Sequence, residues 1–114
     1  MEHVCLTIPI LPGALDDARA FFEELENDRY AAYQESQVRI GVAAETWFIG
    51  EVAGQDTLIG SITYEDFARA VELFSGSSDE FDVWFKQRLK GFTGLDLDDP
   101  PELQLPTLVS HFPR

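Results

Sequence analysis

Cations are scarce in this chain. Of its 114 residues only 8 are Lys or Arg, against 21 Asp and Glu, and the formal net charge at pH 7 is −13. Binding to nucleic-acid phosphates or to an anionic membrane surface needs clustered cations. The nearest approach to a cluster, Lys86, Arg88 and Lys90, is spread along one expected helix. We therefore expect no nucleic-acid partner and no membrane partner, and we interpret the acidity as a solvated surface.

The chain has only one cysteine and no long apolar run. Cys5 is the only cysteine, so the chain can form no internal disulfide and no thiolate zinc cluster. No apolar run approaches the roughly 20 residues that cross a bilayer, and the first residues lack the basic region that opens a signal peptide. Because we recognise no targeting signal in the sequence, we expect a cytoplasmic location.

Recognisable catalytic patterns are absent as well. The sequence has no phosphate-binding glycine loop, no paired catalytic carboxylates and no Ser-His-Asp order at meaningful spacing. The acidic cluster Asp96, Asp98 and Asp99 lacks the turn glycine and terminal Glu of an EF-hand loop. We expect neither a metal nor a tightly held cofactor.

The apolar content is high enough for a packed core. Hydrophobic residues make up 45% of the chain, with nine Phe among them, and the length suits one domain over residues 1–114. Apolar alternation predicts a strand over 3–10, and helical spacing of Leu15, Ala18, Phe22 and Leu25 predicts one long helix from 14 to about 36.

The second half repeats this change of period. A long β segment is expected over 38–52, with a bulge near 43–45, followed by a turn at 53–56 and a strand over 57–63. A helix should begin at 63 or 64 and end near 75. Another should run over 80–92, capped by Asp79 and stopped by Gly94. Residues 107–112 are expected to form a last short strand.

This order predicts an α+β, ferredoxin-like βαββαβ fold. Its four antiparallel strands would lie in the order 4-1-3-2, with the helices on one face. The other face would hold Cys5, Trp47, Ile59 and Val109, which is apolar for a solvated surface. Such a patch predicts a homodimer through the sheet face, in which two sheets close into a dimeric α/β barrel around a cavity.

Three stretches carry a resemblance: HVCLTIPILPG, RIGVAAETWFIG and DVWFKQRLKGFTGLDL. The expected arrangement resembles the dimeric α/β-barrel superfamily, which includes cofactor-independent monooxygenases, haem-degrading enzymes and stress-responsive barrels. More closely, the three stretches look like a family of short bacterial proteins of unknown function. The resemblance implies the fold and brings no catalytic motif.

The two histidines are the first candidate site. If the last strand pairs with the first so that Cys5 faces Val109, then His3 faces His111, about 5 Å away on the sheet face that lines the dimer cavity. Two imidazoles can be half of a metal site or an acid/base pair near neutral pH. The alternative is a pair without a role, since a metal site needs a third ligand.

The remaining candidates surround the expected bulge. Arg39 and Glu45 could form a buried ion pair, or Arg39 could bind a ligand carboxylate; a weak surface pair is the alternative. Trp47 could line a ligand pocket or only fill the core. Tyr33 and Tyr64 could donate hydrogen bonds into a cavity or simply cover the core.

Two interpretations of function follow. In the first, the protein binds a small molecule, or acts on it without a cofactor, in the barrel cavity near His3, Arg39, Glu45, Trp47 and His111. In the second, it is a non-catalytic homodimer with a protein-interaction or stress-related role. A hollow with converging polar groups would favour the first, and a dry, filled interface the second.

Overall fold

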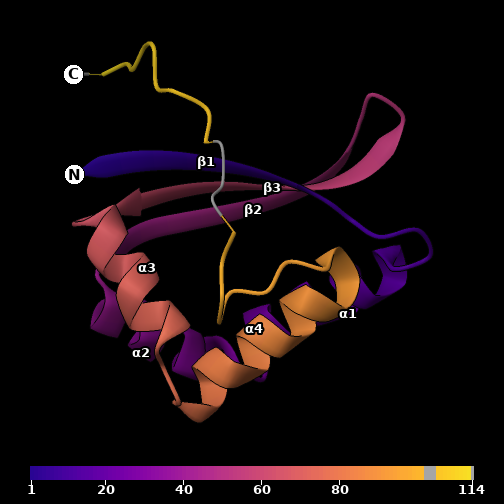
Figure 1. The fold of residues 1–114 in the computed structure, drawn as a ribbon, viewed down its shortest axis with the longest axis horizontal. Helices are drawn as coiled ribbons and strands as arrows, with labels where there is room; N and C mark the ends of the chain where they lie inside the picture. The colour runs from indigo at the N-terminus through magenta and orange to yellow at the C-terminus, as the bar shows by residue number, and fades with distance from the viewer. Residues whose placement is uncertain (102–104, 114) are drawn as a thin grey trace.

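The computed structural model describes residues 1–101 and 105–113 of the chain. In chain order the elements are β1 (Glu2–Pro9), α1 (Leu15–Glu26), α2 (Tyr30–Ile40), β2 (Val42–Val52), β3 (Gln55–Tyr64), α3 (Phe67–Ser75) and α4 (Glu80–Thr93). The strands form one antiparallel sheet in the order β1-β3-β2. The helices lie together on one side of this sheet (Figure 1).

The predicted four-stranded ferredoxin-like sheet is wrong. In the described part of the chain the sheet has three strands, and residues 107–112, expected as the fourth, are not part of it. Pro106 and Pro113 flank the segment, and proline cannot donate to a strand ladder. The side chains of Leu108, Val109 and Phe112 are 55%, 91% and 93% exposed, so burial gives this segment little reason to pair. The predicted dimeric barrel depends on that fourth strand, so this prediction is wrong as well.

The α+β class and the β2–β3 hairpin are confirmed. The connecting residues Ala53 and Gly54 have φ of 51° and 78°, and two positive φ values match the tight turn that suits the twist of paired strands. The expected bulge is present as a register shift between Val42 and Ala44.

The single long helix predicted over 14–36 is two helices. The backbone N–H groups of Asn27 and Arg29 both donate to the carbonyl of Glu24, and the Asn27 side chain donates to the carbonyl of Glu23. Asparagine competes in this way with the helical ladder, which ends α1. The second helix then runs through Val38 and Ile40, residues predicted as strand, and Gly41 ends it with a φ of 80°.

The two later helices begin at aspartates. The Asp66 side chain accepts the backbone N–H of Arg69, so α3 begins at Phe67, later than predicted. The Asp79 side chain accepts the N–H of Phe81, and Gly94 ends α4 with a φ of 79°, which confirms that cap and that stop. None of the helices in the described residues is long and apolar enough to cross a bilayer.

The core lies between the sheet and the helices. Phe21 of α1 is fully buried and contacts the rings of Phe22, Trp84, Phe85 and Phe92. Phe22, predicted as the buried member of the stripe, is only half-buried. The helix-facing side chains of the strands alternate with those of a second, helix-free face.

Candidate functional site

A cavity of about 110 Å³ lies between the sheet and α2, α3 and α4. The segment after α4 covers part of it with Leu95, Leu97 and Pro100. Its wall is mostly apolar, and the remaining lining residues are Leu6, Ile8, Tyr33, Ser36, Gln37, Ile40, Glu45, Trp47, Ile62, Tyr64, Phe67, Ala70, Val71, Phe74, Ser75, Phe81, Phe85 and Leu89. This cavity lies inside one subunit, between the sheet and the helices, and is not the hollow predicted between two sheets.

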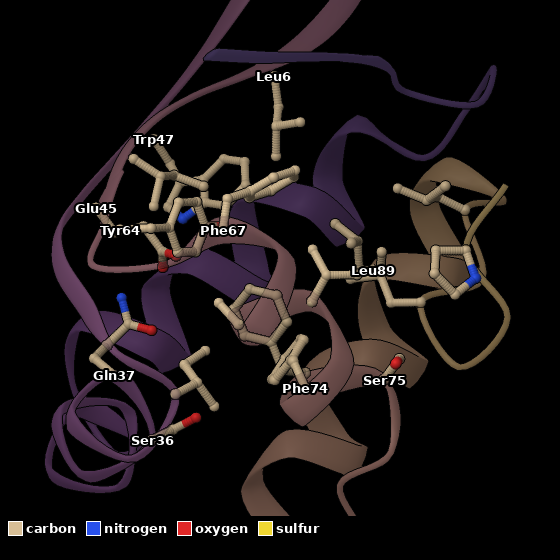
Figure 2. A pocket seen from close by; sticks show the side chains of 18 of the residues that line it. Leu6, Ser36, Gln37, Glu45, Trp47, Tyr64, Phe67, Phe74, Ser75 and Leu89 are labelled. Atoms are coloured by element: carbon tan, nitrogen blue, oxygen red, sulfur yellow. The ribbon is translucent and has the colours of Figure 1, made fainter. Parts of the chain in front are cut away.

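The carboxyl group of Glu45 and the polar atoms of its neighbours gather at one end of this cavity. Figure 2 shows Glu45, Trp47 and Tyr64 together there, with Gln37 below them and Leu89 at the far side. The Tyr33 hydroxyl donates a short hydrogen bond to Oε2 of Glu45. The Trp47 Nε1–H is buried and meets no acceptor at hydrogen-bonding geometry among the described residues.

Glu45 is the central group of this cluster. Burial raises its pKa above the usual 4.5, and the neighbouring Tyr33, Trp47 and Gln37 side chains only partly oppose that rise. A carboxyl group in this setting holds its proton more readily than an exposed one. It can therefore donate as well as accept a hydrogen bond near the pH at which ordinary glutamates are ionised.

The two tyrosines beside Glu45 stay protonated. Burial raises the pKa of Tyr33, and the Glu45 charge and their shared hydrogen bond raise it further. The pKa of Tyr64 is raised by burial first and by Glu45 second. Both phenols are thus fixed hydrogen-bond donors and neutral aromatic walls throughout the physiological pH range.

A register shift puts Glu45 and Trp47 on the helix side. After the bulge at Val42/Ala44, Glu45 pairs with Ile62, and Trp47 pairs with Gly60 on the same face. Strand side chains alternate between faces, so without the bulge Glu45 and Trp47 would point away from the helices. The prediction that Trp47 lies on the helix-free face is wrong, because the face of Trp47 depends on the residue at which the bulge falls, and that residue is set by the pairing with β3.

Gly60 makes room for the indole of Trp47. A Cβ at position 60 would lie 2.5 Å from Cζ3 of the indole and 2.9 Å from both Cε3 and Cη2. The ring therefore lies directly against the backbone of β3, as only a glycine permits. This approach holds Trp47 beside Glu45.

An outer groove lies on the other side of the same cluster. It has a volume of about 490 Å³ and is lined by Arg19, Phe22, Glu26, Tyr33, Glu45, Thr46, Trp47 and Ile49. Tyr33, Glu45 and Trp47 line both spaces. These three side chains therefore form the partition between the inner cavity and the surface.

Arg39 does not join Glu45. Its Nη2 atom lies 2.8 Å from Oδ2 of Asp82 and 3.3 Å from Oδ1 of Asp79. Asp82, which is fully buried, also accepts hydrogen bonds from Ser36 and Ser77. Arg39 thus helps to join α2 to the start of α4, and the predicted Arg39–Glu45 pair is wrong.

The two histidines meet away from the cavity. The rings of His3 and His111 stack with their centroids 4.7 Å apart, and Nδ1 of His3 lies 3.2 Å from the Thr63 hydroxyl. Their meeting does not come from strand pairing, because residues 107–112 form no strand. Within the described residues, no three or more His, Cys, Asp or Glu side chains gather as metal ligands do.

Sequence reasoning named four of the six residues at the polar end and missed two. Glu45 and Trp47 were candidates, and Tyr33 and Tyr64 were considered as donors into a cavity. Gln37 falls between the helix expected to end near 36 and the strand expected from 38, and nothing there signals a site. Gly60 fits the pattern of an ordinary strand residue. A glycine opposite a tryptophan in a predicted hairpin is the one local signal that could have revealed Gly60.

Comparisons with known proteins give no further guide to the site. No protein-family model, no curated protein and no solved structure matches this chain. The resemblance of the expected arrangement to the dimeric α/β-barrel superfamily, and of the three stretches to a family of short bacterial proteins, stays a prediction.

Proposed function

We propose that this protein binds a small, mostly apolar molecule with one hydrogen-bonding head group in the cavity under the sheet. One observation carries the proposal: an otherwise apolar cavity ends at the desolvated carboxyl group of Glu45, with no cation among the described residues that line it. Buried polar groups normally have partners. A ligand head group at Glu45 would add a partner to the Tyr33 hydroxyl that the protein itself supplies.

The size of the cavity limits the ligand. An engineered protein cavity of about 150 Å³ holds benzene, and this one measures about 110 Å³. A branched alkyl chain of four or five carbons fits that volume. Isopentanol, a neutral molecule of that size, is a suitable probe.

The test is a titration with isopentanol followed by the two indole N–H signals in a ¹H–¹⁵N spectrum. The Trp47 signal should shift and saturate, whereas the Trp84 signal should not, because Trp84 does not line the cavity. Ala70→Leu should fill the cavity and abolish the shift, since Ala70 is buried in its wall. Ala68→Leu, on the exposed side of the same helix, is the matched control. Equal shifts of both indoles, or binding that survives Ala70→Leu, would contradict the proposal.

We further propose that two copies of the chain pair through the helix-free face of the sheet. Its strand positions carry no Asp, Glu, Lys or Arg; they are His3, Cys5, Thr7, Pro9, Ala44, Thr46, Phe48, Gly50, Val52, Gln55, Thr57, Ile59, Ser61 and Thr63. Two molecules of charge −13 repel each other over most of their surfaces. An uncharged face, with Phe48 57% exposed on its edge strand β2, is where that repulsion is weakest.

Sedimentation equilibrium tests this pairing. We expect a dimer that Phe48→Glu converts to a monomer, because a carboxylate at a buried contact lacks a partner. Val38→Glu, at an 82% exposed position on α2, should leave the dimer intact. A wild-type protein that is monomeric at high concentration rules this proposal out and leaves the ligand proposal standing.

A further inference from the structure

The polar end of the cavity has a negative group and no positive one. Glu45 is the one ionisable acid among the described residues that line the cavity, and none of those residues is Lys, Arg or His. Lys86, the one buried cation among the described residues, already has partners: its Nζ donates to the carbonyls of Phe74, Ser75 and Ser77 and lies 2.6 Å from Oδ1 of Asp98. Glu45 therefore has no counter-charge within the cavity wall.

Aromatic rings surround this carboxyl group. Trp47, Tyr33 and Tyr64 all line the cavity beside Glu45, and Tyr33 donates to it directly. The faces of such rings attract cations, and protein sites for ammonium ligands combine several of them. Tyr64 is held in place by Phe67, whose ring centroid lies 5.2 Å from its own, and Trp47 is held against Gly60.

We propose that the head group selected by this cavity is an alkylammonium, a primary or secondary amine bound as its cation. This inference rests on the proposed ligand-binding function and names the ligand class. The ammonium N–H donates to the Glu45 carboxylate beside the aromatic side chains of Trp47, Tyr33 and Tyr64, and its alkyl chain occupies the apolar part of the cavity.

The other head groups fit less well. A carboxylate would bring a second negative charge next to Glu45, with no cation among the described lining residues to offset it. An alcohol can donate to the Glu45 carboxylate but carries no positive charge, so it lacks the attraction between opposite charges that an ammonium adds. The net charge of −13 also attracts cations to the surface before they bind.

Binding of an amine requires Glu45 to be ionised, so the groups that face it matter. These are Tyr33 from α2 and Tyr64 from β3, both protonated, with Glu26 and Arg19 of α1 across the outer groove. An ammonium ion favours the charged form of Glu45 and displaces its proton when that proton is present. Amine binding should therefore weaken as the pH falls and Glu45 becomes protonated, whereas alcohol binding should not.

The experiment compares three probes with one alkyl chain and different charges: isopentylamine, isopentanol and isovalerate. Each is titrated at pH 7 into the unaltered protein, with the Trp47 indole signal as the readout and the Trp84 signal as the internal reference. We expect the amine to bind about tenfold or more tighter than the alcohol, because a charge-assisted hydrogen bond and ring contacts are added. Isovalerate should bind most weakly.

Two carboxamide variants separate the cavity from the acidic surface. Glu45→Gln keeps the shape of the side chain and removes its charge, so it should remove the preference for the amine and leave isopentanol within about twofold. Glu51→Gln, at an exposed position of the same strand that lines neither space, should change nothing. Equal loss in both variants would show attraction to surface charge alone and overturn the proposal.

The outcomes distinguish this inference from the function it rests on. If no probe gives a saturable shift of Trp47, the proposed ligand-binding function fails. If isopentanol binds as tightly as isopentylamine, ligand binding stands and the ammonium assignment is refuted. The ranking of probes in the unaltered protein decides between these results even if Glu45→Gln does not fold.

Discussion

Replacing Gly60 with alanine tests the contact that holds Trp47 in the site. The added Cβ would lie 2.5 Å from Cζ3 of the indole, whereas non-bonded carbon atoms prefer about 3.5–4.0 Å. The ring must therefore move by about 1 Å or more. Gly60 does not have a positive φ, so the backbone accepts alanine and the clash is the one penalty.

The magnitude follows from two opposing effects. Overpacking a well-filled site typically costs about 1–3 kcal/mol. Alanine recovers about 0.5–1 kcal/mol, because it restricts the unfolded chain more than glycine does. We expect Gly60→Ala to lower the free energy of unfolding by about 1–2 kcal/mol in total.

Gly50→Ala is the matched control. Gly50 lies in β2 of the same sheet, has no positive φ, and an added Cβ there would meet no atom within 4 Å. This variant should be unchanged or more stable by up to about 1 kcal/mol. The difference between the two substitutions isolates the contact with Trp47 from the general effect of replacing a strand glycine.

Urea denaturation followed by circular dichroism measures all these variants on one scale. Repeating Gly60→Ala in a Trp47→Leu background should remove most of the penalty, because the clashing ring is gone. Our reasoning is refuted if Gly60→Ala is as stable as Gly50→Ala. It is refuted equally if the penalty persists without Trp47.

Four further predictions concern the core, two buried carboxyl groups and the C-terminal segment. Phe21→Ala should lower the free energy of unfolding by about 3–5 kcal/mol. Phe22→Ala should lower it clearly less, because Phe21 is fully buried and Phe22 is not. Equal losses in urea denaturation would show that the assignment of the buried face of α1 is wrong. Burial raises the pKa of Glu45 above 4.5, so the folded state binds more protons and wild-type stability falls as the pH rises from 4.5 through the folded pKa, a loss that Glu45→Gln should not show. Burial alone would raise the pKa of Asp82, but hydrogen bonds from Ser36, Ser77 and Arg39 outweigh burial and hold the pKa below 3.8. Stability is therefore lost as the pH falls through the folded pKa. Asp82→Asn should be less stable at pH 7, and its stability should depend less on pH in the acid range. Thermal unfolding of the wild type and both variants over a series of pH values measures the direction of these two pH dependences. Stability that changes with pH in parallel for wild type and variant would refute them. Removing residues 105–114 should change stability by less than about 0.5 kcal/mol, because most described side chains there are exposed; a larger loss would show that the segment pairs with the sheet after all.

The errors of sequence interpretation come from patterns that two structures share. Val38, Arg39 and Ile40 alternate as a strand would, yet they form the last turn of α2, in which Ile40 is buried and Val38 is exposed. Three residues are too few to separate a period of 2 from one of 3.6. The break between α1 and α2 is likewise hidden in the sequence, because the apolar spacing continues across Asn27. The helix ends there through hydrogen bonds of the Asn27 side chain and of nearby backbone N–H groups.

The last segment shows the limit of a strand pattern without a place to pair. Residues 107–112 look like a short strand in sequence, but a strand forms only where another strand accepts its hydrogen bonds and its apolar face becomes buried. Leu108, Val109 and Phe112 stay exposed in this fold. His3 and His111 nevertheless meet, because the segment passes close to the start of β1 without joining it.

The sequence by itself determined the local features of this protein: the tight turn at Ala53-Gly54, the cap at Asp79 and the stop at Gly94. Each depends on the backbone or side-chain chemistry of a few neighbouring residues, so it can be recognised in a short stretch. Only the tertiary structure decided that Tyr33 of α2 and Glu45 and Trp47 of β2 close one end of a cavity. A one-residue shift in strand register reverses the face of every side chain that follows, and that shift is set by long-range pairing with β3 and packing under the helices.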